Sequence, residues 1–438
     1  MYLALNVLGL LVFLALGWLF SHDRSGIRWR SVAVLTVLNL LIAWGLTSFA
    51  WGRAIVRGAA AGFGELVSVA WEGINFALAN WVGANGVDPE PVNFVVSALL
   101  PILLIVPVFD TLTYLGILPW IIRWIGRGLS AVTGQPRFEA FYAIEMMFLG
   151  NTEAVAVSKL QLQRMSPARD VVIAMMTMSC VSAPILASYM QMVPAEFVLT
   201  AVPVNCLNAL IVAGMLYPVE VPAQDDVVIT CGGPEAENAG SEATAEVSQD
   251  HEDDATGLLA RLRRRRAERP AREPYFSFLG DSILAAGKLI LIITATVITF
   301  VALAALIDKI LGAIWSPLSL EKIVGVVLYV PALLLGLDPS SAWDMSQVMG
   351  LKLVTNEFVA MGEVSGPMSG YAAHMRAVLT VFLTSFANLG TLGMIIGSFK
   401  GIVDKERNDL ISRNVGRMLL SGVLVSLMSA ATVGLFVW

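Results

Sequence analysis

Apolar runs long enough to cross a lipid bilayer recur along the whole chain. A hydrocarbon core about 30 Å thick needs a helix of about 20 apolar residues. Only 14% of the 438 residues are charged, whereas soluble domains carry roughly 25%. The sequence therefore predicts an all-α polytopic membrane protein with about eight transmembrane helices, near residues 2–21, 31–50, 93–118, 170–192, 196–218, 283–306, 375–397 and 414–437.

Two further apolar stretches, residues 138–166 and 342–367, are interrupted by polar residues. Ionisable groups inside a membrane are costly and usually face a cavity or a partner. Irregular backbone at that depth is tolerated only beside a cavity or within protein. Each stretch is therefore predicted to form a re-entrant helical hairpin with a polar tip. Glu145, in the first, is either a proton carrier or an interfacial residue at the base of the hairpin.

Lysine and arginine residues gather in alternate loops and predict the orientation of the chain, because cytoplasmic loops are enriched in them. The basic loops are 22–30, 120–137, 159–169, 219–274 and 400–417. With these loops inside, both termini lie on the periplasmic or extracellular side. The segment with Arg123 and Arg127 is expected to be a helix at the membrane interface. Residues 221–274 are expected to be a disordered charged cytoplasmic linker. Its arginine run is expected to contact anionic lipid or simply to anchor the topology, rather than to bind nucleic acid.

The order of these segments indicates two inverted units, each with a hairpin followed by a span that carries polar residues. Inverted repeats with broken helices are typical of secondary transporters that bind substrate near the middle of the membrane. The predicted organisation is N-terminal scaffold spans at 1–118, a first transport repeat at 119–220, the linker at 221–274, a scaffold span with an interfacial helix at 275–316, and a second transport repeat at 317–438.

The hairpin tips carry the first candidate site residues. Gly150-Asn151-Thr152-Glu153 offers donors and acceptors suited to a polar, uncharged ligand, although it could also be a short loop between ordinary spans. In the second tip, Glu357 follows Asn356. A carboxylate can accept hydrogen bonds from two hydroxyl groups, as in a ribose diol, and such charge-assisted bonds are about twice as strong as neutral ones. The alternative is that Glu357 pairs with Lys352 and serves stability.

Polar residues in two later spans supply the remaining candidates. Asn388 and Thr391 are three residues apart, a spacing that places them on one helical face. Phe386 could stack on a base or pack in the core. In the earlier span, Pro184 is expected to break the helical hydrogen-bond ladder. Ser182 beside it could line a cation or ligand pocket, or could satisfy the freed backbone groups instead.

Three motifs resemble those of the concentrative nucleoside transporter family. The run at 350–361, Gly-x-Lys-x-x-x-Asn-Glu-Phe-Val-Ala-Met, is similar to the family's long signature. The tip at 150–154 resembles its Gly-Gln-Thr-Glu-Ala tip, and residues 385–393 resemble its Gly-Phe-Ala-Asn-Phe-x-Ser-Ile-Gly element. The three motifs occur in order and at family-like spacing. The resemblance runs from about residue 93 to the C terminus, apart from 221–274.

The resemblance implies a homotrimer in which a scaffold supports a moving transport domain. It also implies an elevator-type cycle driven by a cation gradient. Asn151, Thr152 and Glu153 would then bind the nucleobase side of the substrate. The ribose would be held by Glu357, Asn388 and Thr391, with Phe386 lining the pocket.

Two departures from the family pattern bear on selectivity and coupling. Asn151 stands where the family has Gln, so the base preference is expected to differ or the base contacts to be water-mediated. Met146 stands where sodium-coupled members have Asn, and a thioether cannot supply the oxygen that sodium requires. The sequence is thus more similar to the bacterial proton-coupled branch, the NupC type. The candidates for cation coupling are Glu153, Glu357, Glu145 and Ser182.

The leading hypothesis is therefore a nucleoside:proton symporter of a bacterial inner membrane, embedded in lipid, with no cofactor, metal or nucleic acid and no enzymatic activity. Sodium coupling, or transport of a nucleobase or modified nucleoside, stays open. An intramembrane enzyme is disfavoured, because His22, His251 and His374 do not pair with a Ser or Cys in a span and no HExxH motif occurs. A non-transporting sensor that uses residues 221–274 is the remaining rival.

Overall fold

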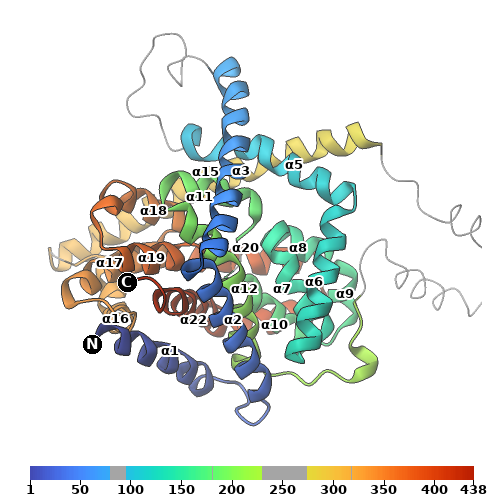
Figure 1. The fold of residues 1–438 in the computed structure, drawn as a ribbon, viewed down its shortest axis with the longest axis horizontal. Helices are drawn as coiled ribbons and strands as arrows, with labels where there is room; N and C mark the ends of the chain where they lie inside the picture. The colour runs from blue at the N-terminus through green and yellow to red at the C-terminus, as the bar shows by residue number, and fades with distance from the viewer. Residues whose placement is uncertain (79–94, 180, 229–273, 317) are drawn as a thin grey trace, which may run out of the picture.

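The computed structural model describes residues 1–78, 95–179, 181–228, 274–316 and 318–438, and all regular structure in these residues is helical. Within them, 7 helices are long and apolar enough to cross a membrane. These are α1 (Tyr2–Leu19), α2 (Trp29–Ser48), α3 (Ala50–Ala77), η1 (Val95–Leu99) with α5 (Ile102–Tyr114), α12 (Ala195–Leu216), α15 (Tyr275–Ile314) and α22 (Val415–Gly434). The predicted all-α polytopic fold is confirmed (Figure 1).

Two of the predicted spans are each broken into two short helices. The span predicted at 170–192 consists of α10 (Pro167–Thr177) and α11 (Ala183–Met192). The span predicted at 375–397 consists of α19 (Ala373–Leu383) and α20 (Leu389–Lys400). Such breaks leave backbone N–H and C=O groups free of intrahelical partners, so side chains or a ligand can bind them.

Both predicted hairpin tips are helix breaks as well. In the first, α7 (Arg137–Leu149) ends at Gly150 and α8 (Asn151–Val157) begins directly after it. Gly150 has a φ of 84°, which favours glycine. A Cβ atom there would lie 2.6 Å from the Cβ of Ser182. The glycine therefore lets the tip lie directly against the break between α10 and α11.

The second hairpin consists of α17 (Pro339–Val354) and α18 (Glu357–Ser365). Asn356 caps α18, because its side-chain oxygen accepts a hydrogen bond from the backbone N–H of Val359 at 3.0 Å. Its extended backbone, with φ −164° and ψ 176°, separates the two helices. The polar residues that interrupt the apolar sequence are thus the residues at which the helix stops.

The order of elements is the same in two halves of the chain. In the first half, α6 (Ile117–Thr133) precedes the α7–α8 hairpin, the broken helix α10–α11 and the long helix α12. In the second, α16 (Leu320–Leu333) precedes α17–α18, α19–α20 and α22. The long helices α12 and α22 pack against each other near the middle of the molecule (Figure 1).

Some boundaries differ from the sequence predictions. Helix α15 is 40 residues long and extends past the span predicted at 283–306, because it contains no proline between Pro274 and its end. Helix α16 begins separately, at Leu320. Helix α3, 28 residues long, lies outside the eight predicted spans. Most of the predicted linker, residues 229–273, lies outside the described residues.

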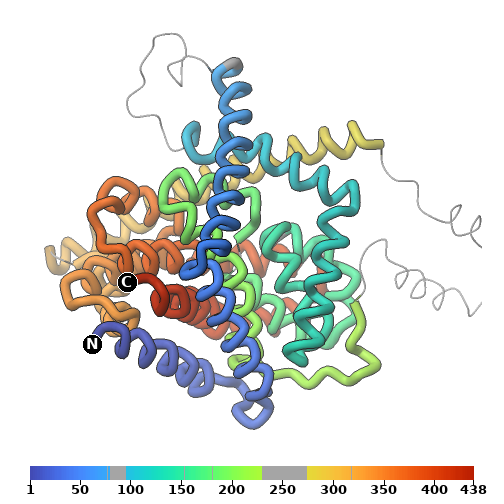
Figure 2. Tube along the Cα trace, in the orientation of Figure 1, coloured from blue at the N-terminus to red at the C-terminus, as the bar shows by residue number. Residues whose placement is uncertain are grey.

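The two ends of the chain lie close together (Figure 2). Helix α1 packs against α22, and both Tyr2 and Trp438 approach Gly336. The carbonyl oxygen of Tyr2 and the ring of Trp438 lie 2.7 and 3.1 Å from the position of a Cβ on that glycine. Both termini thus belong to one end of the bundle. Which side of the membrane that end faces stays a prediction.

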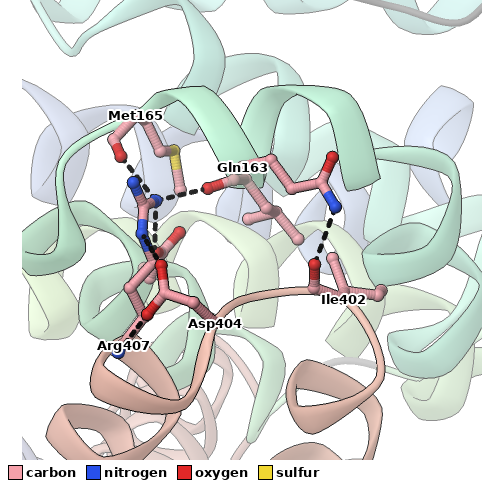
Figure 3. A network of polar contacts seen from close by, with 7 residues as sticks. Gln163, Met165, Ile402, Asp404 and Arg407 are labelled. Atoms are coloured by element: carbon pink, nitrogen blue, oxygen red, sulfur yellow. Dashed lines mark hydrogen bonds and ion pairs between the residues drawn. The ribbon is translucent and has the colours of Figure 1, made fainter.

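A polar network at another corner joins the two halves (Figure 3). Arg407, in α21 (Lys405–Arg413), donates from Nη1 to the carbonyl oxygens of Leu162 and Met165 at 2.9 and 2.7 Å. The same nitrogen lies 3.2 Å from the carboxylate of buried Asp170. Arg407 therefore holds the segment before α10 against the start of α21.

We expect Arg407→Ala to lower the free energy of unfolding by about 3 kcal/mol, because it leaves a buried carboxylate without its cation. The side chains of Asp170 and Arg407 are 0% and 18% exposed. Thermal unfolding of the detergent-solubilised protein measures the effect. Lys405→Ala, at an exposed position of the same helix, is the control and should leave the unfolding temperature unchanged. Equal loss in both variants would contradict this role.

Candidate functional site

The hairpin tips and the helix breaks meet around one cavity. The empty space between its walls is about 800 Å³, part of which is open solvent. Its walls come from α8, the α10–α11 break, α15, the second hairpin and α20. The predicted site residues in these walls are Asn151, Glu153, Ser182, Glu357, Phe386, Asn388 and Thr391.

Two other predicted residues are placed differently. Thr152 lies in α8 between two cavity residues, but its side chain is outside the described part of the structure. Glu145 lies within α7 and is not among the described cavity residues. Its carboxylate is buried and accepts a hydrogen bond from the Oγ of Ser158 at 2.9 Å. Glu145 is therefore an interior residue of the first hairpin, and its role as a proton carrier stays a prediction.

Glu357 is held at the start of α18 by two donors from other helices. Its Oε1 accepts from the hydroxyl of Tyr189 at 3.0 Å, and its Oε2 accepts from Nδ2 of Asn388 at 2.9 Å. Glu357 is 3% exposed and lines the cavity. A carboxylate has about four acceptor positions. After these donors and a contact with its own backbone N–H are counted, the carboxylate keeps acceptor capacity for a hydroxyl group of a ligand.

Asn388 links this carboxylate to α20. Its Oδ1 accepts from the backbone N–H of Thr391 at 2.8 Å and from the Thr391 hydroxyl at 3.1 Å. Asn388 is therefore the N-cap of α20 rather than a residue on the helical face that its spacing predicted. The helix break just before Asn388 gives it an extended backbone, so it caps α20 instead of lying within the helix. Both ends of its amide are used, so its orientation is determined by the contacts.

The alternative role considered for Glu357, an ion pair with Lys352, is not what the structure shows. The Nζ of Lys352 instead donates to the carbonyl oxygen of Phe382 at 2.7 Å and to the Oγ of Ser385 at 2.6 Å. These atoms belong to the break between α19 and α20. The side chains that hydrogen-bond to Glu357 are thus neutral, while the charge of Lys352 acts on its carboxylate without direct contact.

Two parts of the site were not predicted from the sequence. Tyr189, in α11, is fully buried and packs edge-on against Phe358, with ring centroids 5.0 Å apart. A phenol hydroxyl within an apolar span was the available signal, because a buried Tyr needs a partner. The second part is the wall from α15, formed by ordinary apolar sequence that carries no such signal. Its residues are Leu289, Ile292, Ile293, Thr296 and Phe300.

We expect Tyr189→Phe to weaken nucleoside binding about tenfold, because it removes one hydrogen bond to a charged group. Equilibrium binding of a radiolabelled nucleoside to purified protein measures this. Tyr142→Phe is the matched control, since its buried hydroxyl bonds Thr177 at 2.9 Å outside the cavity wall. Unchanged affinity of the Tyr189 variant would show that Glu357 does not need this donor.

A helical membrane protein with two structurally similar halves and broken helices around one polar cavity has the architecture of a secondary transporter. Comparison with known families agrees. The family model described as "Na+ dependent nucleoside transporter C-terminus" matches residues 197–434, and the corresponding N-terminus model matches residues 8–81. This chain belongs to the concentrative nucleoside transporter family, whose members are transporters and not enzymes.

Relatives cover the full length of the chain. It is 41% identical to the purine nucleoside transport protein NupG of Bacillus subtilis over 438 residues, which is 100% of both chains. It is 26% identical to the nucleoside permease NupC of Helicobacter pylori, covering 99% of this chain and 97% of that one. It is also 24% identical to mouse solute carrier family 28 member 3, covering 98% of this chain and 58% of that one.

The fold is that of a solved transporter, CNTnw. Its inward-facing, substrate-bound structure has a TM-score of 0.83 and 24% identity, covering 100% of this chain and 98% of that chain. A variant of CNTnw in an outward-facing state has a TM-score of 0.82 and 22% identity, with the same coverage. Structures of CNTnw in intermediate states share the fold as well. The fold is therefore one that occurs in several states of an alternating-access cycle.

Proposed function

We propose that this chain takes up nucleosides across a bacterial inner membrane by proton symport. The observation that carries the proposal is the buried carboxylate of Glu357. Tyr189 and Asn388 hold it, and it keeps acceptor capacity beside a cavity. A ribose diol presents two adjacent hydroxyl donors, which fit such a carboxylate. The two transport repeats would move together as an elevator against the scaffold.

The base side of the substrate is assigned to the first hairpin. Asn151 and Glu153 line the opposite part of the cavity wall from α8, with Ser182 beside them. Phe386 also lines the cavity and offers a ring face to a base. The relative of 41% identity is named a purine nucleoside transport protein. Purine nucleosides are therefore the proposed substrates.

Proton coupling is proposed because of the residue at position 146 in the first hairpin. Met146 is fully buried in α7, and its thioether offers no oxygen to a sodium ion. Glu357 and Glu153 are carboxyl groups in the cavity wall that can exchange a proton with bound water or substrate. Sodium coupling remains the alternative, since the matching family models are described as Na+ dependent.

The wall from α15 suits an elevator movement. Of its five cavity residues, only Thr296 is polar, and its hydroxyl bonds the carbonyl oxygens of Ile292 and Ile293 within α15 itself. The transport repeats can slide along such a surface without breaking polar contacts to it. Much of the outer surface of α15 is apolar and exposed in one chain, as expected for a helix that faces lipid or neighbouring subunits of a homotrimer.

Uptake of radiolabelled inosine and uridine into proteoliposomes tests the proposal. We expect uptake with an inward proton gradient, loss of uptake with a proton ionophore, and faster uptake of the purine nucleoside. Uptake that follows an imposed sodium gradient and ignores pH would overturn proton coupling.

Two further arms of the same assay separate the rival functions. Competition by free bases as strong as competition by nucleosides would overturn the ribose assignment and favour a nucleobase carrier. Uptake that survives deletion of residues 229–273 would disfavour a sensor that depends on them.

A further inference from the structure

The second helix break contains a cation that the proposed transport cycle does not use. The side chain of Lys352 is fully buried. Its Nζ donates to the carbonyl oxygen of Phe382 at 2.7 Å, to the Oγ of Ser385 at 2.6 Å and to the Oγ of Ser426 at 3.5 Å. It also lies 4.6 Å from the centroid of the Phe382 ring. Three oxygens and a ring face thus surround one ammonium group.

The position of this ammonium group has an electrostatic reason. Helix α17 ends at Val354, two residues after Lys352, and α19 ends at Leu383, directly after Phe382. The C-terminal end of a helix carries partial negative charge and carbonyl groups without intrahelical partners. Two such ends meet here inside the protein, because α17 packs against α19. The ammonium of Lys352 donates to the last turn of α19, and its positive charge is also favourable in the last turn of α17.

The first repeat has the same backbone arrangement without the charge. Lys352 lies four residues before the N-cap of α18, and Met146 lies four residues before Gly150, the N-cap of α8. Ser385 and Ser179 each lie three residues before the next N-cap. Each of these serines donates to the carbonyl oxygen three residues earlier, at 3.5 and 3.3 Å. The two breaks are equivalent, but only the second contains an ammonium group.

The ammonium group is close in sequence to both parts of the ribose site. Lys352 lies five residues before Glu357, and Ser385 lies three residues before Asn388. Nζ therefore links the second hairpin to the α19–α20 break. Glu357 and Asn388, which follow these positions in the sequence, hydrogen-bond to each other at 2.9 Å. Ser426 extends the contact to α22. Loss of the ammonium would free the carbonyl of Phe382 and the two serines to rearrange.

We infer that Lys352 acts as a built-in monovalent cation, whose ammonium occupies a cation site at the second helix break and thereby positions Asn388 and Glu357 for the nucleoside. Lys352 is a positioning residue, since Glu357 and Asn388 line the cavity and Lys352 does not. The inference rests on the proposed function, because it takes nucleoside affinity as one of its measures.

The test compares Lys352→Met, which fills the space without charge, with Lys352→Ala, which leaves the site empty. Equilibrium nucleoside binding and thermal unfolding are measured in detergent at constant ionic strength, with or without propylammonium. This ion has the atoms that the alanine substitution removes, and propanol is its neutral control. Lys400→Ala, at an exposed position at the end of α20, is the matched lysine control.

We expect both Lys352 variants to bind nucleoside about tenfold more weakly or worse, because hydrogen bonds of a charged donor are lost. Propylammonium should restore affinity in Lys352→Ala alone and leave the wild type, Lys352→Met and Lys400→Ala unchanged. Wild-type affinity in Lys352→Met would overturn the inference. So would a folded, weakly binding Lys352→Ala variant that ignores propylammonium. If Lys352→Ala does not fold, the nucleoside affinity of Lys352→Met alone tests the inference: weaker binding supports it, and wild-type affinity overturns it.

The unfolding measurement separates this inference from the proposed function. A wild-type protein that binds no nucleoside would refute the proposed function. In that case, a propylammonium-dependent rise in the unfolding temperature of Lys352→Ala, absent from the wild type, would still support the cation site. No rise would overturn it.

Discussion

Glu357→Gln is expected to reduce nucleoside affinity about a hundredfold, the largest effect predicted for this protein. The change removes the charge from bonds to the ribose hydroxyls, each of which contributes about 1.5 kcal/mol or more. It also replaces one carboxylate oxygen with an amide donor. That amide must then face either the hydroxyl of Tyr189 or the Nδ2 of Asn388, both of which donate to Glu357. Equilibrium binding and proteoliposome uptake measure the loss.

Glu363→Gln is the matched control for this prediction. Glu363 lies in the same helix, α18, and its side chain is exposed. Its substitution should leave affinity and uptake as in the wild type. Normal binding by Glu357→Gln would refute the assignment of Glu357 to the ribose, and equal losses in both variants would point to a general defect of α18.

Asn388→Asp is expected to weaken nucleoside binding by a similar factor for a different reason. Aspartate is as good an N-cap as asparagine, so the bonds from Thr391 to this position are kept. The donor to Glu357, however, becomes an acceptor 2.9 Å from a carboxylate oxygen. Two carboxylates at this distance repel strongly in a buried site. The variant therefore keeps the N-cap of α20 but loses the hydrogen bond to Glu357. Nucleoside binding should fall while the protein stays folded.

Asn414→Asp is the control for this change. Asn414 is also an N-cap, of α22, and its Oδ1 accepts from Nη1 of Arg417 at 3.0 Å. A carboxylate there loses the bond from Nδ2 to the carbonyl oxygen of Leu410 but keeps Arg417 as its cation, and it lies outside the cavity wall, so transport should stay normal. Full nucleoside affinity in Asn388→Asp would show that the contact between Asn388 and Glu357 is not required for binding.

Much of the architecture could be predicted because the membrane limits the choices. Each long apolar run had to form a helix, and the polar interruptions at Gly150 and Asn356 had to be breaks. Motif spacing then indicated which polar residues belong together, and the structure brings Asn151 and Glu357 to one cavity. The length of α15 and the continuity of α3 were not predicted, because polar residues mark where a span leaves the membrane more clearly than where its helix ends.

The helical fold, the two polar tips and the family-like motifs can be predicted from local composition and order. The partners of the buried polar groups depend instead on tertiary packing. Tyr189 reaches Glu357 across 168 positions of the chain, and Lys352 donates to the carbonyl of Phe382 rather than to the carboxylate of Glu357, which is closer in sequence. Such contacts depend on how helix ends meet in space, because a buried charge or hydroxyl takes whichever partner the packing places beside it.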